Sequence, residues 1–174
     1  MKQDRLEIMR FMIPTSKIIG DNSATHWKSH MGKLKWLSNK TRNIIEGFEE
    51  APGNFQPPTV DETKDFIDGK PVKVIFEIWR YGNRAFDLYN YSKTSKAIID
   101  SLTNLGYWED DNWNYMRPVV VNGGGLSVWN EHIIADNSIG LPEDNSELKE
   151  WWKENNDDMK STFMRLIISK DRNL

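Results

Sequence analysis

Residues 72–79, VKVIFEIW, form the most strand-like segment of this chain. Its β-branched residues and its partial alternation of apolar and polar side chains predict a central β-strand. On either side of this segment, the apolar patterns of residues 6–13, 116–121 and 162–168 predict three more strands. Pro14 ends the first of these because proline cannot continue a hydrogen-bonded ladder.

Two longer helices are predicted between these strands. Apolar residues recur at helical spacing over residues 33–48 and again over residues 91–105. Gly106 follows the second helix, at the position where a glycine in the left-handed conformation commonly ends a helix. Strands that enclose helices in this order predict an α+β fold, a mixed sheet with helices packed on it.

The length of 174 residues suits a single domain over residues 1–174. Residues 51–69 hold three Pro and two Gly, so we expect an irregular, mobile insertion with one short turn at residues 61–66. Residues 122–159 are expected to be an added segment. It would open with a flexible turn at residues 123–125 and contain a short helix at residues 147–155.

Composition excludes several classes of function. The chain has no Cys, which rules out disulfides, thiolate zinc sites and cysteine nucleophiles and favours a reducing cytoplasm. No long uncharged apolar run is present, so we expect neither secretion nor a membrane partner. The 23 Lys and Arg against 26 Asp and Glu give a formal charge of −3, which weighs against a general nucleic-acid binder. It does not exclude a nuclease, because such an enzyme needs carboxylates.

Polar residues that could carry chemistry gather around the second helix. Asp87 and Asn90 precede it, where backbone donors favour an anion such as phosphate. A helix over residues 91–104 is about 21 Å long at ~1.5 Å per residue, and the following residues could bring Asp111 back beside Asp87. Carboxylates that converge without His or Cys suit Mg²⁺ or Mn²⁺. Lys96 beside them would stabilise charge on a phosphoryl group.

A purely structural reading of the same residues stays open. Asp87 could be a helix cap, residues 110–112 could form a turn, and Lys96 with Asp100 could be a surface ion pair at i,i+4 spacing. Taken one at a time, each of these residues fits the structural role better than the catalytic one.

Three short runs give the chain a family resemblance. KAIIDSL at residues 96–102, GYW at 106–108 and the Asp110–Asp111 pair resemble the core signature of the RusA-type Holliday junction resolvases, small endonucleases common in phages and prophages. Asn22, followed by HW at residues 26–27 and KLKW at residues 33–36, resembles the opening of a phage-type branch. The resemblance covers residues 8–116 in the order of elements, and residues 162–168 fit the last strand of the family. It implies a small α+β domain that forms a homodimer.

The resemblance also implies roles for individual residues. Asp87 and Asp111 match metal-binding aspartates, with Asp110 as the neighbour of Asp111. Lys96 matches the lysine required for cleavage, and Lys93 is the competing assignment. The second motif aspartate of the family falls on Tyr89, or on Ser92 in the other alignment, so one expected ligand is missing. Two residues could compensate for it, namely Asn90 and Asp100, although Asp100 could instead only orient Lys96.

The activity implied is Mg²⁺-dependent hydrolysis of phosphodiesters in four-way-junction or branched DNA, for recombination and repair in the cytoplasm, that of the host if a phage encodes the chain. A homodimer would nick symmetric strands together. The missing ligand and the charge of −3 keep open a catalytically inactive DNA-binding or regulatory protein on the same fold. A protein-interaction module is the third possibility.

The basic and aromatic segment after residue 26 is the candidate surface for DNA. A solvated helix face explains its charges nearly as well. The spacing of His26 and His30 could suit zinc, but no third ligand is near, so we expect His26 to pack or to contact DNA. The residues expected to contact DNA are Asn22, His26, Lys28, Lys33, Lys35, Arg80 and Arg84.

Overall fold

The computed structural model describes residues 4–19, 27–52, 55–80, 91–112, 114–125 and 162–170. Within these ranges the chain forms four strands, three α-helices and one short 3₁₀ helix. In chain order they are β1 (Arg5–Ile13), η1 (Thr15–Lys17), α1 (Trp27–Ile45), α2 (Val60–Ile67), β2 (Val72–Arg80), α3 (Ser92–Asn104), β3 (Met116–Gly125) and β4 (Thr162–Ser169).

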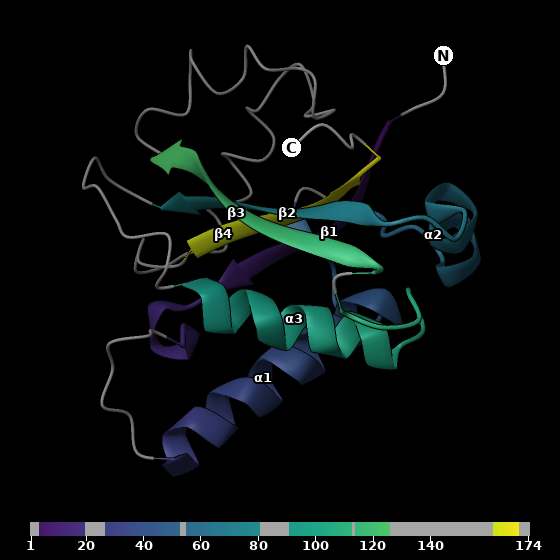
Figure 1. Ribbon diagram of the computed structural model, residues 1–174. Coiled ribbons are helices and arrows are strands. Elements are labelled where there is room, and N and C mark those ends of the chain that lie inside the picture. The colour runs from purple at the N-terminus through teal and green to yellow at the C-terminus, as the bar shows by residue number, and fades with distance from the viewer. Residues whose placement is uncertain are drawn as a thin grey trace.

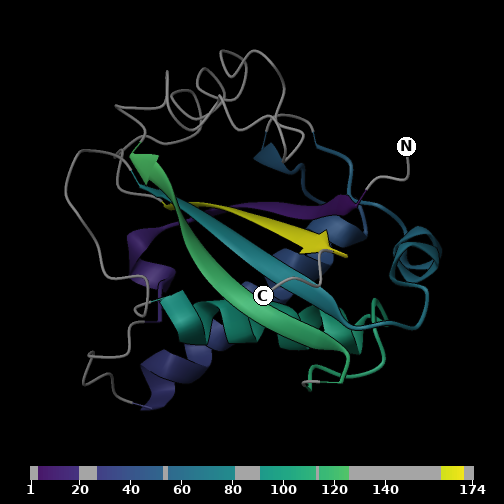
Figure 2. The ribbon, with the colours of Figure 1, turned by 45° about the horizontal axis from the view of Figure 1, so that its top comes forward.

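The four strands form one mixed sheet in the order β1-β4-β2-β3. Strand β4 is antiparallel to both of its neighbours, whereas β2 and β3 are parallel. Parallel strands need a long crossover connection, and α3 lies in the one that joins β2 to β3 (Figures 1 and 2). The expected α+β class with a mixed sheet is therefore confirmed.

Helices α1 and α3 cover one face of the sheet (Figure 1). The side chains of alternate residues in β2 point to this face, and their partners on β4 do the same. Phe76, for example, pairs with Leu166, and both are fully buried. From the helices, Leu37 of α1 and Ile98 of α3 join the same hydrophobic core.

The opposite face of the sheet carries a row of buried charges across three strands. Register places Arg10 of β1, Arg165 of β4 and Glu77 of β2 side by side. Arg165 donates through Nη2 to Glu77 Oε2 at 2.8 Å, and Arg10 donates through Nε to Glu7 Oε1 at 2.5 Å. Burial raises the pKa of the Glu77 carboxyl above its ordinary value, although Arg165 opposes this shift. The row thus pairs charges across neighbouring strands, beside the buried apolar side chains of Phe163 and Ile167 on the same face of β4.

The expected strands and the helix after residue 91 are confirmed, but the first helix differs from its predicted bounds. It begins at Trp27, six residues before the predicted start, and ends at Ile45. Gly47 adopts a left-handed φ of 80°, and the N–H of Phe48 bonds back to the Asn43 carbonyl, which closes the helix. Phe48, the last residue of the predicted helix, therefore lies outside it and is 77% exposed.

The segment over residues 51–69 contains more structure than the single short turn we expected. Helix α2 occupies residues 60–67 and begins with a capping box, in which Thr59 Oγ1 accepts from the Glu62 N–H and the Glu62 carboxylate accepts from the Thr59 N–H. Asp68, in the left-handed conformation, follows its end. The capping box satisfies donors at the helix start that an irregular segment would leave exposed.

The expected flexible turn at residues 123–125 is wrong. These glycines extend β3, where Gly124 and Gly125 pair with Trp79 and Arg80 after a register shift in the β2–β3 ladder. A bulge absorbs an extra residue at such a shift, and glycine suits it. The rest of the expected added segment, including its predicted helix, lies outside the described residues.

In the described ranges, no helix combines the length and the apolar composition needed to span a bilayer.

Candidate active site

Helix α3 presents two of the predicted site residues on its exposed side. Lys96 and Asp100 are four residues apart and therefore lie one above the other on the same face. The opposite side of the helix packs Ile98 and Leu102 into the core. Near its start, the buried Thr94 accepts a hydrogen bond from the Ile19 N–H at 3.0 Å, which ties the helix to the segment after η1. The exposed face is thus held on a fixed helix.

The chain reverses direction directly after α3. Gly106 has a φ of 88°, and its N–H bonds to the Thr103 carbonyl at 3.0 Å. The Tyr107 N–H bonds to the Leu102 carbonyl at 3.1 Å, which completes the pattern of a glycine-terminated helix. The predicted role of Gly106 is confirmed.

Two buried aromatic side chains then fix the path of the returning chain. Tyr107 donates its hydroxyl to the Pro58 carbonyl at 2.8 Å, and Trp108 donates Nε1 to Thr103 Oγ1 at 2.6 Å. Neither aromatic residue was predicted from the sequence to have this anchoring role. The signal was present, because an apolar residue directly after a helix-ending glycine commonly packs back on the last turn.

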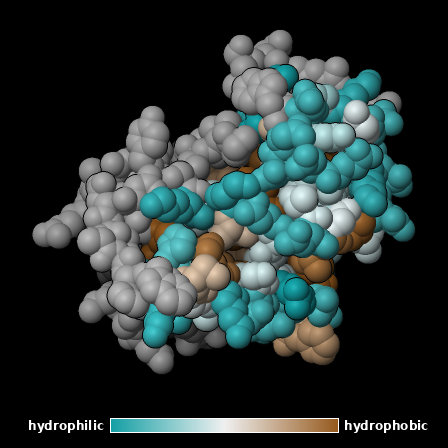
Figure 3. Space-filling view, turned by 60° about the horizontal axis from the view of Figure 1, so that its bottom comes forward, coloured by the Kyte–Doolittle hydropathy of each residue, from teal (hydrophilic) through white to brown (hydrophobic). Residues whose placement is uncertain are grey.

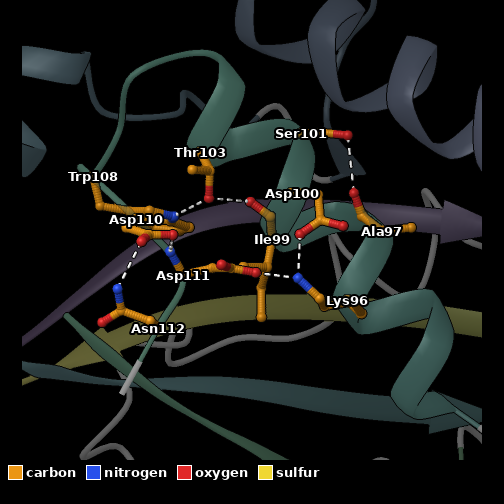
Figure 4. Close-up of polar contacts among 10 residues, drawn as sticks. All are labelled: Lys96, Ala97, Ile99, Asp100, Ser101, Thr103, Trp108, Asp110, Asp111 and Asn112. Carbon is orange, nitrogen blue, oxygen red and sulfur yellow. Dashed lines mark hydrogen bonds and ion pairs between the residues drawn. The ribbon is translucent and has the colours of Figure 1, made fainter. Parts of the chain in front are cut away.

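The returning chain brings Asp111 to the exposed side of α3. Figure 4 shows the Lys96 ammonium between two carboxylates. It donates to Asp100 Oδ1 at 2.5 Å and also to Asp111 Oδ2. The Lys96 side chain is 59% exposed and that of Asp111 is 26% exposed, so the group faces solvent. Lys96, the lysine that the resemblance matches to the cleavage lysine, thus contacts Asp111. Lys93, the competing assignment, lies three residues earlier on the same helix.

Lys96 and Asp111 stabilise each other's charged form. The hydrogen bonds to Asp100 and Asp111 raise the pKa of Lys96 above its ordinary value. In turn, the hydrogen bond from Lys96 lowers the pKa of Asp111. At neutral pH Lys96 is therefore an ammonium ion beside the ionised carboxylate of Asp111, and Lys96 cannot serve as a base.

Asp110 and Asn112 shape the turn around Asp111. The Asp110 carboxylate accepts from the Asp111 N–H at 2.7 Å and from Asn112 Nδ2 at 2.6 Å. Asn112 Oδ1 then accepts from the Asn114 N–H at 2.9 Å. Both structural alternatives, the turn at residues 110–112 and the Lys96–Asp100 ion pair, are therefore present. The turn leaves the Asp111 carboxylate pointing at Lys96.

The side chains at this site offer oxygen donors, the type of ligand that a hard divalent cation prefers. Asp100 and Asp111 direct carboxylate oxygens at one positive charge, and oxygen is the ligand that Mg²⁺ prefers. Among the described residues, no group of three or more His, Cys, Asp or Glu side chains is arranged to hold a metal. The described residues thus supply part of a coordination shell.

Several predicted site residues cannot be placed. The convergence of Asp87 with Asp111 stays a prediction, and the same holds for the role of Asn90. The residues of the predicted site and DNA surface that lie outside the described ranges are Asn22, His26, Arg84, Asp87 and Asn90. Arg80 is the last residue of β2.

The basic segment predicted to contact DNA lies on α1. Lys33 donates Nζ to the Ile18 carbonyl at 3.1 Å, and Lys40 forms an ion pair with Glu49. Lys28 and Lys35 are exposed on the same helix. Only part of the predicted basic surface therefore faces solvent.

Comparison with known proteins does not assign this chain to a family. No family model matches the chain, and no curated protein matches it significantly.

Proposed function

We propose that this protein is a metal-dependent endonuclease that hydrolyses phosphodiesters in branched DNA, including four-way junctions. The observation that supports this most is the Lys96 ammonium held against the Asp111 carboxylate on the exposed side of α3. The two residues are fifteen positions apart, and the resemblance of residues 96–111 to RusA-type resolvases gives them the roles of cleavage lysine and metal ligand.

Lys96 acts in this proposal through its positive charge. Its raised pKa keeps the ammonium protonated, so it can offset negative charge that develops on the phosphate as the bond breaks. Asp100 keeps the side chain in place through the second hydrogen bond. Asp100 is therefore a positioning residue.

Asp111, together with Asp87, would hold the cation. Bound Mg²⁺ or Mn²⁺ supplies a Lewis acid that polarises the phosphate and lowers the pKa of an attacking water. The Asp110 turn keeps the Asp111 carboxylate directed toward the site. A homodimer would place two such sites so that opposite strands of a junction are cut together.

The test is nicking of a synthetic four-way junction with and without Mg²⁺, with Asp111→Asn compared to the wild type. Asp65→Asn is the matched control, because Asp65 is an exposed carboxylate on α2, an element that contributes no residue to the site. We expect the wild type and the control to cut symmetric strands only with the metal. The Asp111 variant should bind the junction without cutting it.

Two results would overturn the proposal. If the wild type binds the junction but never cuts it with Mg²⁺ or Mn²⁺, the protein is a DNA-binding or regulatory protein. If Asp111→Asn cuts at the wild-type rate, the Lys96–Asp111 pair is a surface ion pair and the catalytic site lies elsewhere.

A further inference from the structure

Helix α1 differs in charge from the rest of the molecule. It contains five Lys or Arg and no acidic residue, in a chain with a formal charge of −3. Its apolar side, which includes Leu37 and Ile44, is buried in the core. Viewed from the helix side of the sheet, the surface of the described residues is largely hydrophilic (Figure 3).

Only three of the five basic side chains lie on the exposed face of α1. Lys33 and Lys40 are engaged by the Ile18 carbonyl and by Glu49. Lys28, Lys35 and Arg42 are exposed and are seven residues apart, which places them in line along one side of the helix. At ~1.5 Å per residue this basic stripe is about 21 Å long.

We infer that the basic stripe, Lys28, Lys35 and Arg42, binds the phosphate backbone of a DNA duplex. A duplex carries one negative charge per ~1.7 Å of axis. A straight stripe laid along the duplex therefore has phosphates within reach of each of its three cations. Lys35 and Arg42 form no ion pair within the described part of the chain, so binding DNA breaks no such contact. Charge complementarity therefore selects a rod-shaped polyanion.

Two other occupants fit the stripe less well. An amphipathic helix that binds a membrane needs large apolar residues on its exposed face, and here Met31 is the only one between Lys28 and Arg42. Single-stranded DNA is held by stacking on aromatic side chains, and no exposed position in this interval is aromatic. The stripe offers charge alone, which suits the backbone of a duplex.

The position of α1 extends the proposed function, on which the choice of DNA rests. Helix α1 packs against α3, the helix that carries Lys96, on the same side of the sheet (Figure 1). A duplex arm bound on α1 would therefore lie beside the helix that carries the site. The stripe would add affinity that does not depend on sequence.

The test compares Lys35→Gln/Arg42→Gln with Lys64→Gln/Lys70→Gln, a control that removes the same charge from exposed positions elsewhere. Binding of a labelled duplex is measured by fluorescence anisotropy in EDTA over roughly 50 to 200 mM salt. We expect the slope of log K against log salt to fall in magnitude by about 2 in the stripe variant, since each phosphate contact contributes roughly 0.9. Adding Lys28→Gln should lower it by about one more.

The control should keep the wild-type slope, and thermal melting should show that both variants fold. Equal slopes in the two variants would overturn the inference, as would equal competition by polyglutamate, which would indicate general polyanion binding. Tighter binding to phosphatidylserine vesicles than to duplex would also overturn it. Because EDTA prevents cleavage, a protein that binds through the stripe but never cuts would refute only the proposed function. A protein that cuts with an unchanged slope in the stripe variant would refute only the stripe.

Discussion

The Lys96 ammonium donates a hydrogen bond to the carboxylate of Asp111, fifteen residues further along the chain. The contact exists because Gly106 ends α3 and because Tyr107 and Trp108 anchor the returning chain. The Lys96–Asp111 contact therefore depends on the structure at the end of α3 as well as on the two residues themselves. Substitutions at either place should affect the site in different ways.

Replacing Lys96 by Met should lower junction nicking by about 10²–10³-fold, because the charge that offsets the phosphate is lost. Asp100→Asn should have a smaller effect, about tenfold or less, since Asp111 still holds the lysine. Single-turnover nicking at saturating Mg²⁺ measures both rates. Junction binding in EDTA should change little in Asp100→Asn.

A matched control for this pair is Lys64→Met, which removes an exposed lysine on α2. Its nicking rate should equal that of the wild type. If Asp100→Asn were as slow as Lys96→Met, Asp100 would bind the metal or the substrate itself, and the positioning role would be wrong.

Tyr107→Phe should destabilise the fold by about 1 kcal/mol at neutral pH, because the hydrogen bond to the Pro58 carbonyl is lost. Urea denaturation of the two proteins measures the difference in the free energy of unfolding. The nicking rate should also fall, since this anchor holds the chain that carries Asp111.

The effect should depend on pH. Burial, with a further contribution from Glu62, raises the pKa of Tyr107 to about 12, against 10.0 for an exposed tyrosine. A raised folded pKa gives stability that is complete below the unfolded pKa and is lost as the pH rises through the folded one. The advantage of the wild type over Tyr107→Phe should therefore shrink between pH 10 and pH 12. A difference that stayed constant over this range would contradict the assignment.

The sheet was largely predictable from the sequence. Strands such as β2 and β4 are dense in β-branched and apolar residues, and every residue of β4 is buried. The buried charges were not predictable, because Glu77 and Arg165 are 88 residues apart and only the β2–β4 register joins them. From the sequence alone, a charged residue in an apolar strand could equally be a solvent-exposed side chain or a member of a buried ion pair.

Glycine residues explain two of the differences between the predicted and the observed fold. Gly47 ends α1, so Phe48 falls outside the helix although its spacing matches the apolar stripe. Glycines 123–125 were predicted to form a turn, because the sequence does not show that they pair with β2. Long-range pairing decided the outcome there.

The candidate site was predictable in part. A helix followed by a glycine and a short return indicates that a later residue can lie beside the helix, and Asp111 does. The position of that contact was not predictable. The return holds a turn at residues 110–112 rather than extended chain, so its reach could not be judged from residue counts.

Arg165→Met should cost about 3 kcal/mol in the free energy of unfolding, because it leaves the carboxylate of Glu77 buried without its ion-pair partner. The double variant Arg165→Met/Glu77→Gln should recover part of that loss, since no charge is then stranded between β2 and β4. Urea denaturation of the single and double variants measures the coupling. Glu7 keeps its contact with Arg10 in every case.

If the two substitutions were simply additive, the buried contact between Arg165 and Glu77 would contribute no coupling energy. The matched control is Lys73→Met, because Lys73 is a half-buried cation on β2, four residues before Glu77 and therefore on the same face of the strand. We expect it to cost much less than Arg165→Met.

Two glycine substitutions should change stability in opposite directions. A Cβ atom at Gly32 or at Gly106 would meet no atom within 4 Å, so packing does not distinguish the two positions. Gly32 lies inside α1, where Gly32→Ala should stabilise the fold by roughly 0.5–1 kcal/mol, because alanine loses less backbone entropy in a helix. Gly106 has a φ of 88°, so Gly106→Ala should destabilise it by roughly 1–2 kcal/mol through backbone strain.

Thermal and urea denaturation of the two variants measure these differences, and junction nicking adds an independent readout. Gly32→Ala should leave the nicking rate unchanged. Gly106→Ala should lower it even at a temperature where the variant is fully folded, because the strained residue lies between Lys96 and Asp111 in the chain. An Ala variant at position 106 that is as stable and as active as the wild type would show that the left-handed conformation does not set the return of Asp111 to α3.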